Sequence, residues 1–206
     1  YKRQVDARTP LPKERPERKE YVAHMHVTQK SVEKSTMCGG DGLPTVNPKT
    51  DHRIFAILDE GCNATCHTIG FKKKARAEIE RQGIRFPSLV EKVRDYAGIG
   101  SAKSHGYRDL PWGMKMQKKG YLEGTLKSNE LVGTEDEVYM LLSLHAQATL
   151  GVVKDAREGT CYLKEFKDYC QLYRVSGSGL RAICISEFDP TTEPQPADSA
   201  KRRRSR

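Results

Sequence analysis

The chain has 206 residues, of which 36% are hydrophobic and 31% are charged, and its formal net charge is +9. This length allows one domain with a modest core and polar extensions. No apolar run is long enough to cross a bilayer as a helix, so we expect no membrane span. The basic charge favours an anionic partner such as RNA or an acidic protein, and plain solubility is the alternative explanation.

The cysteines are spread along the chain without the spacing of a disulfide framework. They are Cys38, Cys62, Cys66, Cys161, Cys170 and Cys184. We therefore expect free thiols and a reducing intracellular compartment, with organelles included. The chain begins with Tyr1, so we expect a missing or processed N-terminus, and the lack of a signal peptide says nothing about location.

Residues 1–49 are predicted to form an extended, basic N-terminal arm and a first strand. Three prolines prevent a long helix near the start. Lys2 and Arg3 are candidate contacts to nucleic-acid phosphates, although disorder or a plain linker would explain the same composition. A short strand is expected at 21–27, followed by a glycine-containing connection at 36–51.

The most informative stretch is 53–70. Its apolar run Ile54–Leu58 is too short for a helix and rich in strand formers, which predicts a buried strand. The run ends at Asp59, whose carboxyl group is expected in surroundings of low dielectric, where its pKa rises unless hydrogen bonds counter the burial. Gly61 permits a tight turn, so neighbouring N–H groups can point at that carboxylate.

Cys62, Cys66 and His67 follow this turn, and with Cys38 they offer a zinc-site hypothesis. One short segment supplies only three of those ligands, and two cysteines four apart share a face only on a helix. Small buried thiols in a tight core are the interpretation that we prefer. No cofactor is expected.

Two helices are expected before the middle of the chain. Residues 71–83 place Phe71, Ala75 and Ile79 on one side and can end at a glycine. Ser88 can cap a second helix, with apolar residues spaced along its first turns.

A glycine-rich loop at Gly98, Ile99 and Gly100 has the flexibility that a lid over a substrate needs, although an ordinary hairpin turn is equally consistent. Strands at 110–116 and 121–126 are expected to pair across the basic turn between them. Trp112, Met114 and Met116 would then share one face, as expected of core residues.

A buried strand is predicted at 139–142, followed by a helix that Ser143 caps and Gly151 ends. This helix would hold Leu144, Ala146, Ala148 and Leu150, and we expect His145 and Gln147 to face solvent. Further strands and turns continue to Phe188, so the sequence predicts a mainly β domain with inserted helices.

The β domain is expected to span 50–188, and the remaining residues 189–206 form a basic C-terminal tail. Its candidate nucleic-acid contacts are Lys201, Arg202, Arg203, Arg204 and Arg206. Such a cluster neutralises phosphates without reading sequence. A nuclear-import signal or solvated charge would look the same.

The order of these motifs resembles retropepsin-like aspartic peptidases, and most of all those of Copia-type retroelement polyproteins. The resemblance covers roughly 50–188. It rests on the apolar strand with the acidic turn at 59–61, the glycine loop at 97–101, and the apolar strand and helix with Leu-Leu-Ser at 141–143 and Leu-Gly-Val at 150–152.

This resemblance implies a single-lobe β-barrel, with Asp59 as the catalytic acid beside Gly61 and a flap at 98–100. Glu60 departs from the family pattern, which has Thr or Ser at that position. Because aspartic peptidases need two carboxylates that share a proton, and the chain offers one candidate, activity would require a homodimer through the Asp59 loop.

Three hypotheses follow. In the first, Glu60 adds like charge at the seam between two copies and abolishes activity, and the chain is a structural RNA- or protein-binding subunit of a large assembly such as a ribosome. In the second, the chain is an active homodimeric aspartic endopeptidase. In the third, it is a zinc-binding adaptor.

Overall fold

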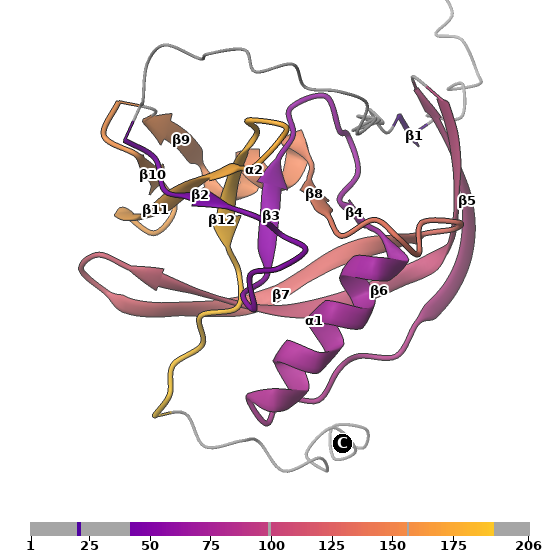
Figure 1. Cartoon of the computed structure of the whole chain (residues 1–206), viewed down its shortest axis with the longest axis horizontal. Helices are drawn as coiled ribbons and strands as arrows, with labels where there is room; N and C mark the ends of the chain where they lie inside the picture. Colours follow the sequence, from indigo (N-terminus) through magenta and orange to yellow (C-terminus); the bar gives the residue numbers. More distant parts are fainter. Residues whose placement is uncertain (1–19, 22–41, 99, 156, 192–206) are drawn as a thin grey trace, which may run out of the picture.

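A computed structural model describes residues 20–21, 42–98, 100–155 and 157–191. Within these ranges the fold is mainly β with two helices, as the sequence predicted (Figure 1). The helices are α1 (Ile69–Arg81) and α2 (Leu144–Leu150). The strands are β1 (Glu20–Tyr21), β2 (Thr45–Val46), β3 (Phe55–Leu58), β4 (Cys66–His67), β5 (Val90–Gly98), β6 (Gly100–Met116), β7 (Gly120–Leu131), β8 (Met140–Leu142), β9 (Val152–Asp155), β10 (Thr160–Leu163), β11 (Asp168–Val175) and β12 (Arg181–Cys184).

The strands form one mixed sheet with the order β1-β5-β6-β7-β4-β8-β3-β12-β11-β10-β9, and β2 pairs with β11. β3 runs parallel to β8 and antiparallel to β12, near the middle of this path. The expectation of a closed barrel is wrong for the described residues, because the path has two ends, β1 and β9, that do not pair with each other.

The long hairpin of β6 and β7 extends across the molecule, with α1 alongside it (Figure 1). Trp112 lies opposite Gly124 in this hairpin. A Cβ atom at Gly124 would lie 2.9 Å from Cζ2 of Trp112, so glycine is needed for the indole ring to lie across the partner strand. Trp112, Met114 and Met116 are buried, as the sequence predicted.

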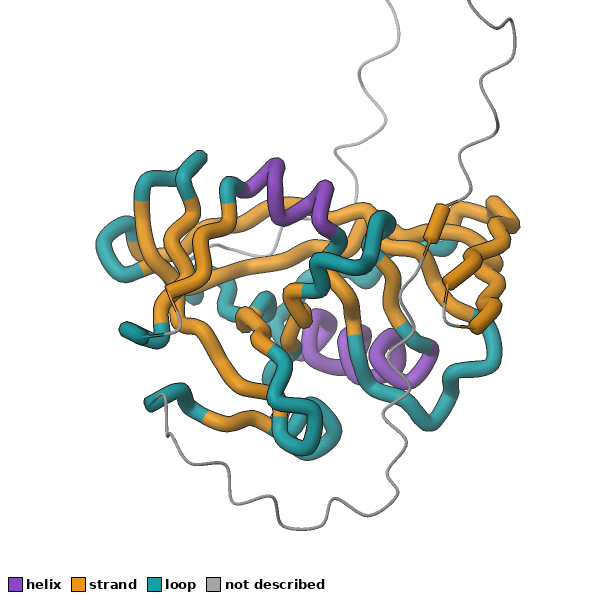
Figure 2. The backbone as a smooth tube through the Cα atoms, turned by 90° about the horizontal axis from the view of Figure 1, so that it is seen from above, coloured by secondary structure: helices purple, strands orange, loops and turns teal. Residues whose placement is uncertain are grey.

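β3 is buried on both faces, which explains its uninterrupted apolar sequence. Ala56 and Leu58 belong to a core cluster that also contains residues of α1, β6 and β11. Phe55 and Ile57 belong to a second cluster on the opposite face, with residues of β7 and β12 among others. The two helices are separated in the view of Figure 2, yet both pack on the first cluster: α1 through Phe71, Ala75 and Ile79, and α2 through the partly buried Ala146 and Leu150.

The predicted helix at 71–83 is confirmed as α1, although it begins two residues earlier. Thr68 caps it, because its Oγ1 accepts a hydrogen bond from the N–H of Phe71 at 3.1 Å. Phe71, Ala75 and Ile79 are buried, as expected.

The predicted helix after Ser143 is confirmed as α2, and Gly151 ends it in the left-handed conformation with φ of 64°. The assignment of its faces was partly wrong. Gln147 is only 4% exposed, because its Nε2 donates to the carbonyl of Leu142 at 2.8 Å. His145 is exposed, as expected, and Leu144 is 53% exposed.

The second helix predicted after Ser88 is wrong, since β5 occupies that stretch. Its apolar residues have helical spacing, but Val90 and Val93 are 45% and 75% exposed, so no core draws them into a helix. The backbone pairs instead with β6 over most of its length, and this tertiary pairing overrides the local pattern.

Several predictions fall outside the described residues. They concern the N-terminal arm with Lys2 and Arg3, the C-terminal cluster at 201–206, Cys38, and Ile99. The domain boundaries at 49 and 188 therefore stay predictions. Among the described residues, no helix is long and apolar enough to cross a membrane.

Candidate functional site

Asp59 lies directly after β3, at the point where the buried strand reaches the surface. Its backbone N–H donates to the carbonyl of Leu142 at 3.3 Å, which ties the turn to the end of β8. Its Oδ1 accepts a hydrogen bond from the N–H of Gly61 at 2.9 Å, so one backbone donor points at the carboxylate as expected. The side chain is half-buried and the next two residues are exposed. The acid is thus held by the turn and accessible from outside.

The negative charge of Glu60, the residue after Asp59, is compensated by an ion pair. Its Oε1 forms an ion pair with Nζ of Lys154 on β9 of the same chain. The hydrogen bond and charge of Lys154 lower the pKa of Glu60, so the carboxylate is ionised and paired at neutral pH. Because the Glu60 side chain is 64% exposed, the pair contributes little to stability, but it holds this side chain toward β9.

The turn is fixed to its neighbours by a buried polar network. Oγ1 of Thr65 donates to Oγ of Ser143 at 3.0 Å and accepts from its N–H at 3.2 Å. The carbonyl of Thr65 accepts two hydrogen bonds from Asn129 on β7, one from the backbone at 3.0 Å and one from Nδ2 at 2.9 Å. The N–H of Leu144 donates to the carbonyl of Cys62 at 2.8 Å. The segment after Asp59 is therefore joined to both β7 and α2.

The cysteines and histidine of the zinc hypothesis do not converge. Cys62 and Cys66 are buried and their thiols contact each other, although they are not on a helix. The hydrogen bond with Cys62 and burial raise the pKa of the Cys66 thiol. His67 lies elsewhere, with Nδ1 2.8 Å from Oγ of Ser128. No group of three or more metal-binding side chains occurs among the described residues, so these three do not form the proposed zinc site.

A buried ionic cluster joins α1, β6 and β7 beside the site. Glu130 is only 4% exposed, and its carboxylate accepts from Nε of Arg108 at 2.8 Å and from Nζ of Lys72 at 3.0 Å. Nε2 of His67 lies 3.7 Å away. Burial alone would raise the pKa of Glu130, but these three neighbours together hold it well below its usual range. Sequence reasoning missed this cluster, because its members come from four separate elements.

The predicted flap corresponds to the β5–β6 hairpin, in which Gly98 pairs with Gly100 at the tip. Further from the tip, the register shifts between Glu91 and Arg94 on β5 and between Ser104 and Gly106 on β6. Such irregularities bend a hairpin. The hairpin curves away from α1 at its upper end (Figure 1).

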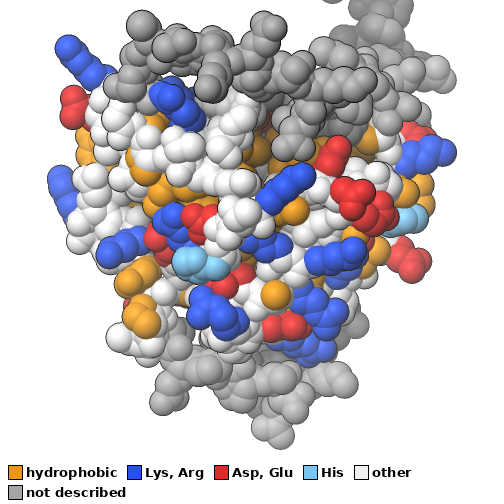
Figure 3. Space-filling model, in the orientation of Figure 1, with side chains coloured by type: hydrophobic (Ala, Val, Ile, Leu, Met, Phe, Trp, Pro, Cys, Tyr) orange, Lys and Arg blue, Asp and Glu red, His pale blue; other side chains and the backbone are white. Residues whose placement is uncertain are grey.

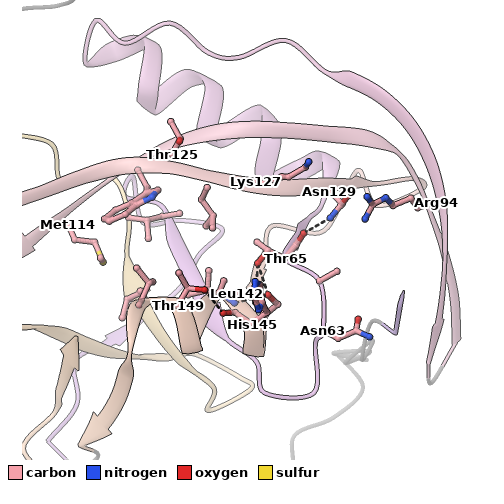
Figure 4. Close-up of a pocket in the computed structure, with 18 residues that line it drawn as sticks. Asn63, Thr65, Arg94, Met114, Thr125, Lys127, Asn129, Leu142, His145 and Thr149 are labelled. Carbon is pink, nitrogen blue, oxygen red and sulfur yellow. Dashed lines mark hydrogen bonds between the residues drawn. The ribbon is translucent and has the colours of Figure 1, made fainter. Parts of the chain in front are cut away.

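A cavity of about 400 Å³ lies between these strands and α2 (Figure 4). Asn63, Ala64 and Thr65 contribute to its wall directly after the acidic turn, and Leu142 and Ser143 contribute from the end of β8. This volume is in the range of sites that bind small organic groups. The structure therefore contains a largely apolar cavity whose wall begins at Asn63, shortly after the turn of Asp59, and sequence reasoning had not foreseen it.

The face shown in Figure 3 carries Lys and Arg side chains interspersed with Asp and Glu, without a large area of one charge. The ion pair of Arg76 with Glu80 and the ion pair of Arg81 with Glu78 on α1 are examples of this mixing. On this face, the described domain does not offer the uniform basic surface that phosphate binding favours.

Comparison of the chain with protein-family models, with curated proteins and with solved structures finds no match. The functional argument therefore depends on the geometry of the chain itself.

Proposed function

We propose that two copies of this chain form a homodimeric aspartic endopeptidase of the retropepsin type, with one Asp59 contributed by each copy. The observation that carries the proposal is the position of this acid. It follows a strand buried on both faces, accepts a hydrogen bond from the N–H of Gly61 and remains accessible. Its turn is attached to β8 through Leu142 and, at Cys62, to the first residue of α2.

In the proposed dimer, the two carboxylates share one proton across a water molecule. The unprotonated carboxylate takes a proton from that water as the water attacks the peptide carbonyl, and the protonated one donates to the carbonyl oxygen. Collapse of the tetrahedral intermediate then releases the amine, which takes the proton that the first carboxylate removed from the water, while a hydroxyl group of the intermediate returns a proton to the second carboxylate. Because this mechanism needs one protonated and one ionised carboxylate, activity is expected to be greatest in mildly acidic solution.

The position of Glu60 favours the active form over the inactive scaffold. The objection to activity was a second negative charge beside each Asp59. The ion pair with Lys154 compensates that charge within the chain and directs the side chain toward β9. Leu144, which is 53% exposed and begins α2 next to the turn, offers apolar surface for contact with a second copy.

The test uses the full chain. Sedimentation velocity over a range of concentrations should show a monomer–dimer equilibrium, and cleavage of an unfolded protein at pH 4.5–6 should rise with the dimer fraction and be inhibited by pepstatin. Asp59→Asn should abolish cleavage, whereas Asp136→Asn, in an exposed turn, should retain it. Cleavage that survives Asp59→Asn, or a chain that stays monomeric and inert, would refute the proposal.

A second candidate function is an RNA-binding subunit of a large assembly. The observation that favours it is the run of basic residues at 201–206, with five Lys or Arg among six positions. Binding through such a segment should weaken steeply between 50 and 200 mM salt. Replacing the five basic residues by Gln in the full chain should remove binding to a single-stranded RNA, and affinity that is unchanged would exclude this role for the tail.

A further inference from the structure

The cavity that begins at Asn63, after the turn of Asp59, has one apolar end and one polar end. Trp112 and Met114 of β6 and Ile183 of β12 line it with buried apolar surface. Arg94 of β5, Lys127 of β7 and Asn129 lie together at the end opposite Met114 (Figure 4). A ligand that fits this cavity therefore carries an apolar group and a polar or charged group side by side.

The charge of the lining has one sign. Among the 18 residues that line the cavity, Arg94, Lys127 and His145 are basic and none is acidic. They come from β5, β7 and α2, so the fold collects them from three elements that are distant in sequence. Nζ of Lys127 lies 3.7 Å from the centre of the Tyr107 ring, so a cation–π contact positions this ammonium group. Such a lining attracts a carboxylate.

Asn129 adds a hydrogen-bonding group at the same end. This side chain is only 6% exposed, and its Nδ2 is used by the carbonyl of Thr65 at 2.9 Å. Its Oδ1 has no hydrogen-bond partner among the described residues. A buried acceptor without a partner is unfavourable, so a ligand N–H that reaches this oxygen would gain by pairing with it.

We propose that this cavity selects peptide segments in which an apolar side chain is next to an acidic one. The apolar side chain would pack on Trp112, and the Asp or Glu carboxylate would meet Lys127 and Arg94. A peptide is the ligand argued for because the wall at 63–65 continues directly from the turn of Asp59. This inference rests on the proposed function and adds to it the class of sequence that is bound near the cleavage site.

The experiment separates binding from cleavage by using full-length Asp59→Asn protein. Two fluorescent peptides, identical except for Leu-Glu in one and Leu-Gln in the other, are titrated and followed by anisotropy. We expect the Leu-Glu peptide to bind about tenfold more tightly at low salt, as one charge-assisted contact allows, and the ratio to shrink as salt rises. Lys127→Gln should remove the preference, and Lys73→Gln, on the exposed side of α1, should keep it.

Equal affinity for the two peptides, or a preference that survives Lys127→Gln, would overturn the inference. Charge-selective binding together with no cleavage by the unsubstituted chain would overturn the proposed function and leave the binding site in place. Cleavage of both peptides at the same rate and with the same affinity would leave the proposed function standing and refute the selectivity alone.

Discussion

The buried carboxylate of Asp168 gives the sharpest test of the fold, through the substitution Asp168→Asn. This side chain is fully buried. One oxygen, Oδ2, accepts hydrogen bonds from the N–H groups of Lys118 and Lys119 at 3.0 and 2.9 Å, and Oδ1 accepts from the N–H of Tyr169 at 2.8 Å. The residue thereby joins the turn between β6 and β7 to the start of β11.

The expected cost follows from this geometry. Asparagine has one acceptor oxygen, so its amide group must face at least one of the three N–H donors. One charge-assisted bond is lost and a buried donor is left without a partner, which together cost about 3 kcal/mol. For a chain of this size, that is a fall in Tm of roughly 6–12 °C.

The assay is urea unfolding followed by tryptophan fluorescence, with Asp155→Asn as the matched control. Asp155 is exposed, and both of its bonds, to the N–H groups of Arg157 and Glu158, use the same oxygen, Oδ1. The side-chain oxygen of asparagine can accept both hydrogen bonds, so we expect the free energy of unfolding to change by less than about 0.5 kcal/mol. Equal unfolding free energies for the two variants would show that the three bonds to Asp168 do not act as described.

Two further predictions concern stability. Glu130→Gln should cost about 3–5 kcal/mol at pH 7, because Arg108 and Lys72 lose their buried partner. The pKa of Glu130 is lower in the folded chain than in the unfolded chain. The carboxylate therefore stabilises the fold fully above its unfolded pKa of about 4.3, and this stabilisation is lost as the pH falls below that value. The difference between variant and wild type in urea titrations should therefore narrow between pH 5 and 3, and a constant difference would contradict the assignment. Gly106→Ala should destabilise by about 3 kcal/mol, because a Cβ atom there would lie 2.1 Å from the carbonyl oxygen of Val90; an unchanged urea midpoint would contradict that contact.

The candidate site was partly readable in the sequence. An apolar run that stops at an acid and a glycine locates Asp59 at the end of a buried strand, because both signals are local. The polar end of the cavity was not readable. Arg94, Lys127 and His145 come from three separate elements and carry no shared motif. Only the pairing of β5, β6 and β7 brings the first two to one face.

Glu60 illustrates the same limit at a single position. From the sequence, an acid next to Asp59 predicts repulsion between like charges. The compensating charge could not be foreseen, because Lys154 is 94 residues away along the chain. The structure pairs the two side chains and so changes the argument about activity. The charge at a site depends on which distant side chains the fold brings near it, and no local pattern contains that information.

The sequence by itself determined the mainly β class, the buried strand β3, the caps of α2 and the burial of Trp112 and its neighbours. These features depend on periodicity, turn residues and capping side chains within a few positions of one another. Only the tertiary structure decided that the stretch after Ser88 is a strand, that Gln147 is buried and Leu144 exposed, that the sheet is open, and which charges surround the acid. Those outcomes depend on backbone and side-chain partners far away in the chain, whose contributions outweigh the local preferences that the sequence displays.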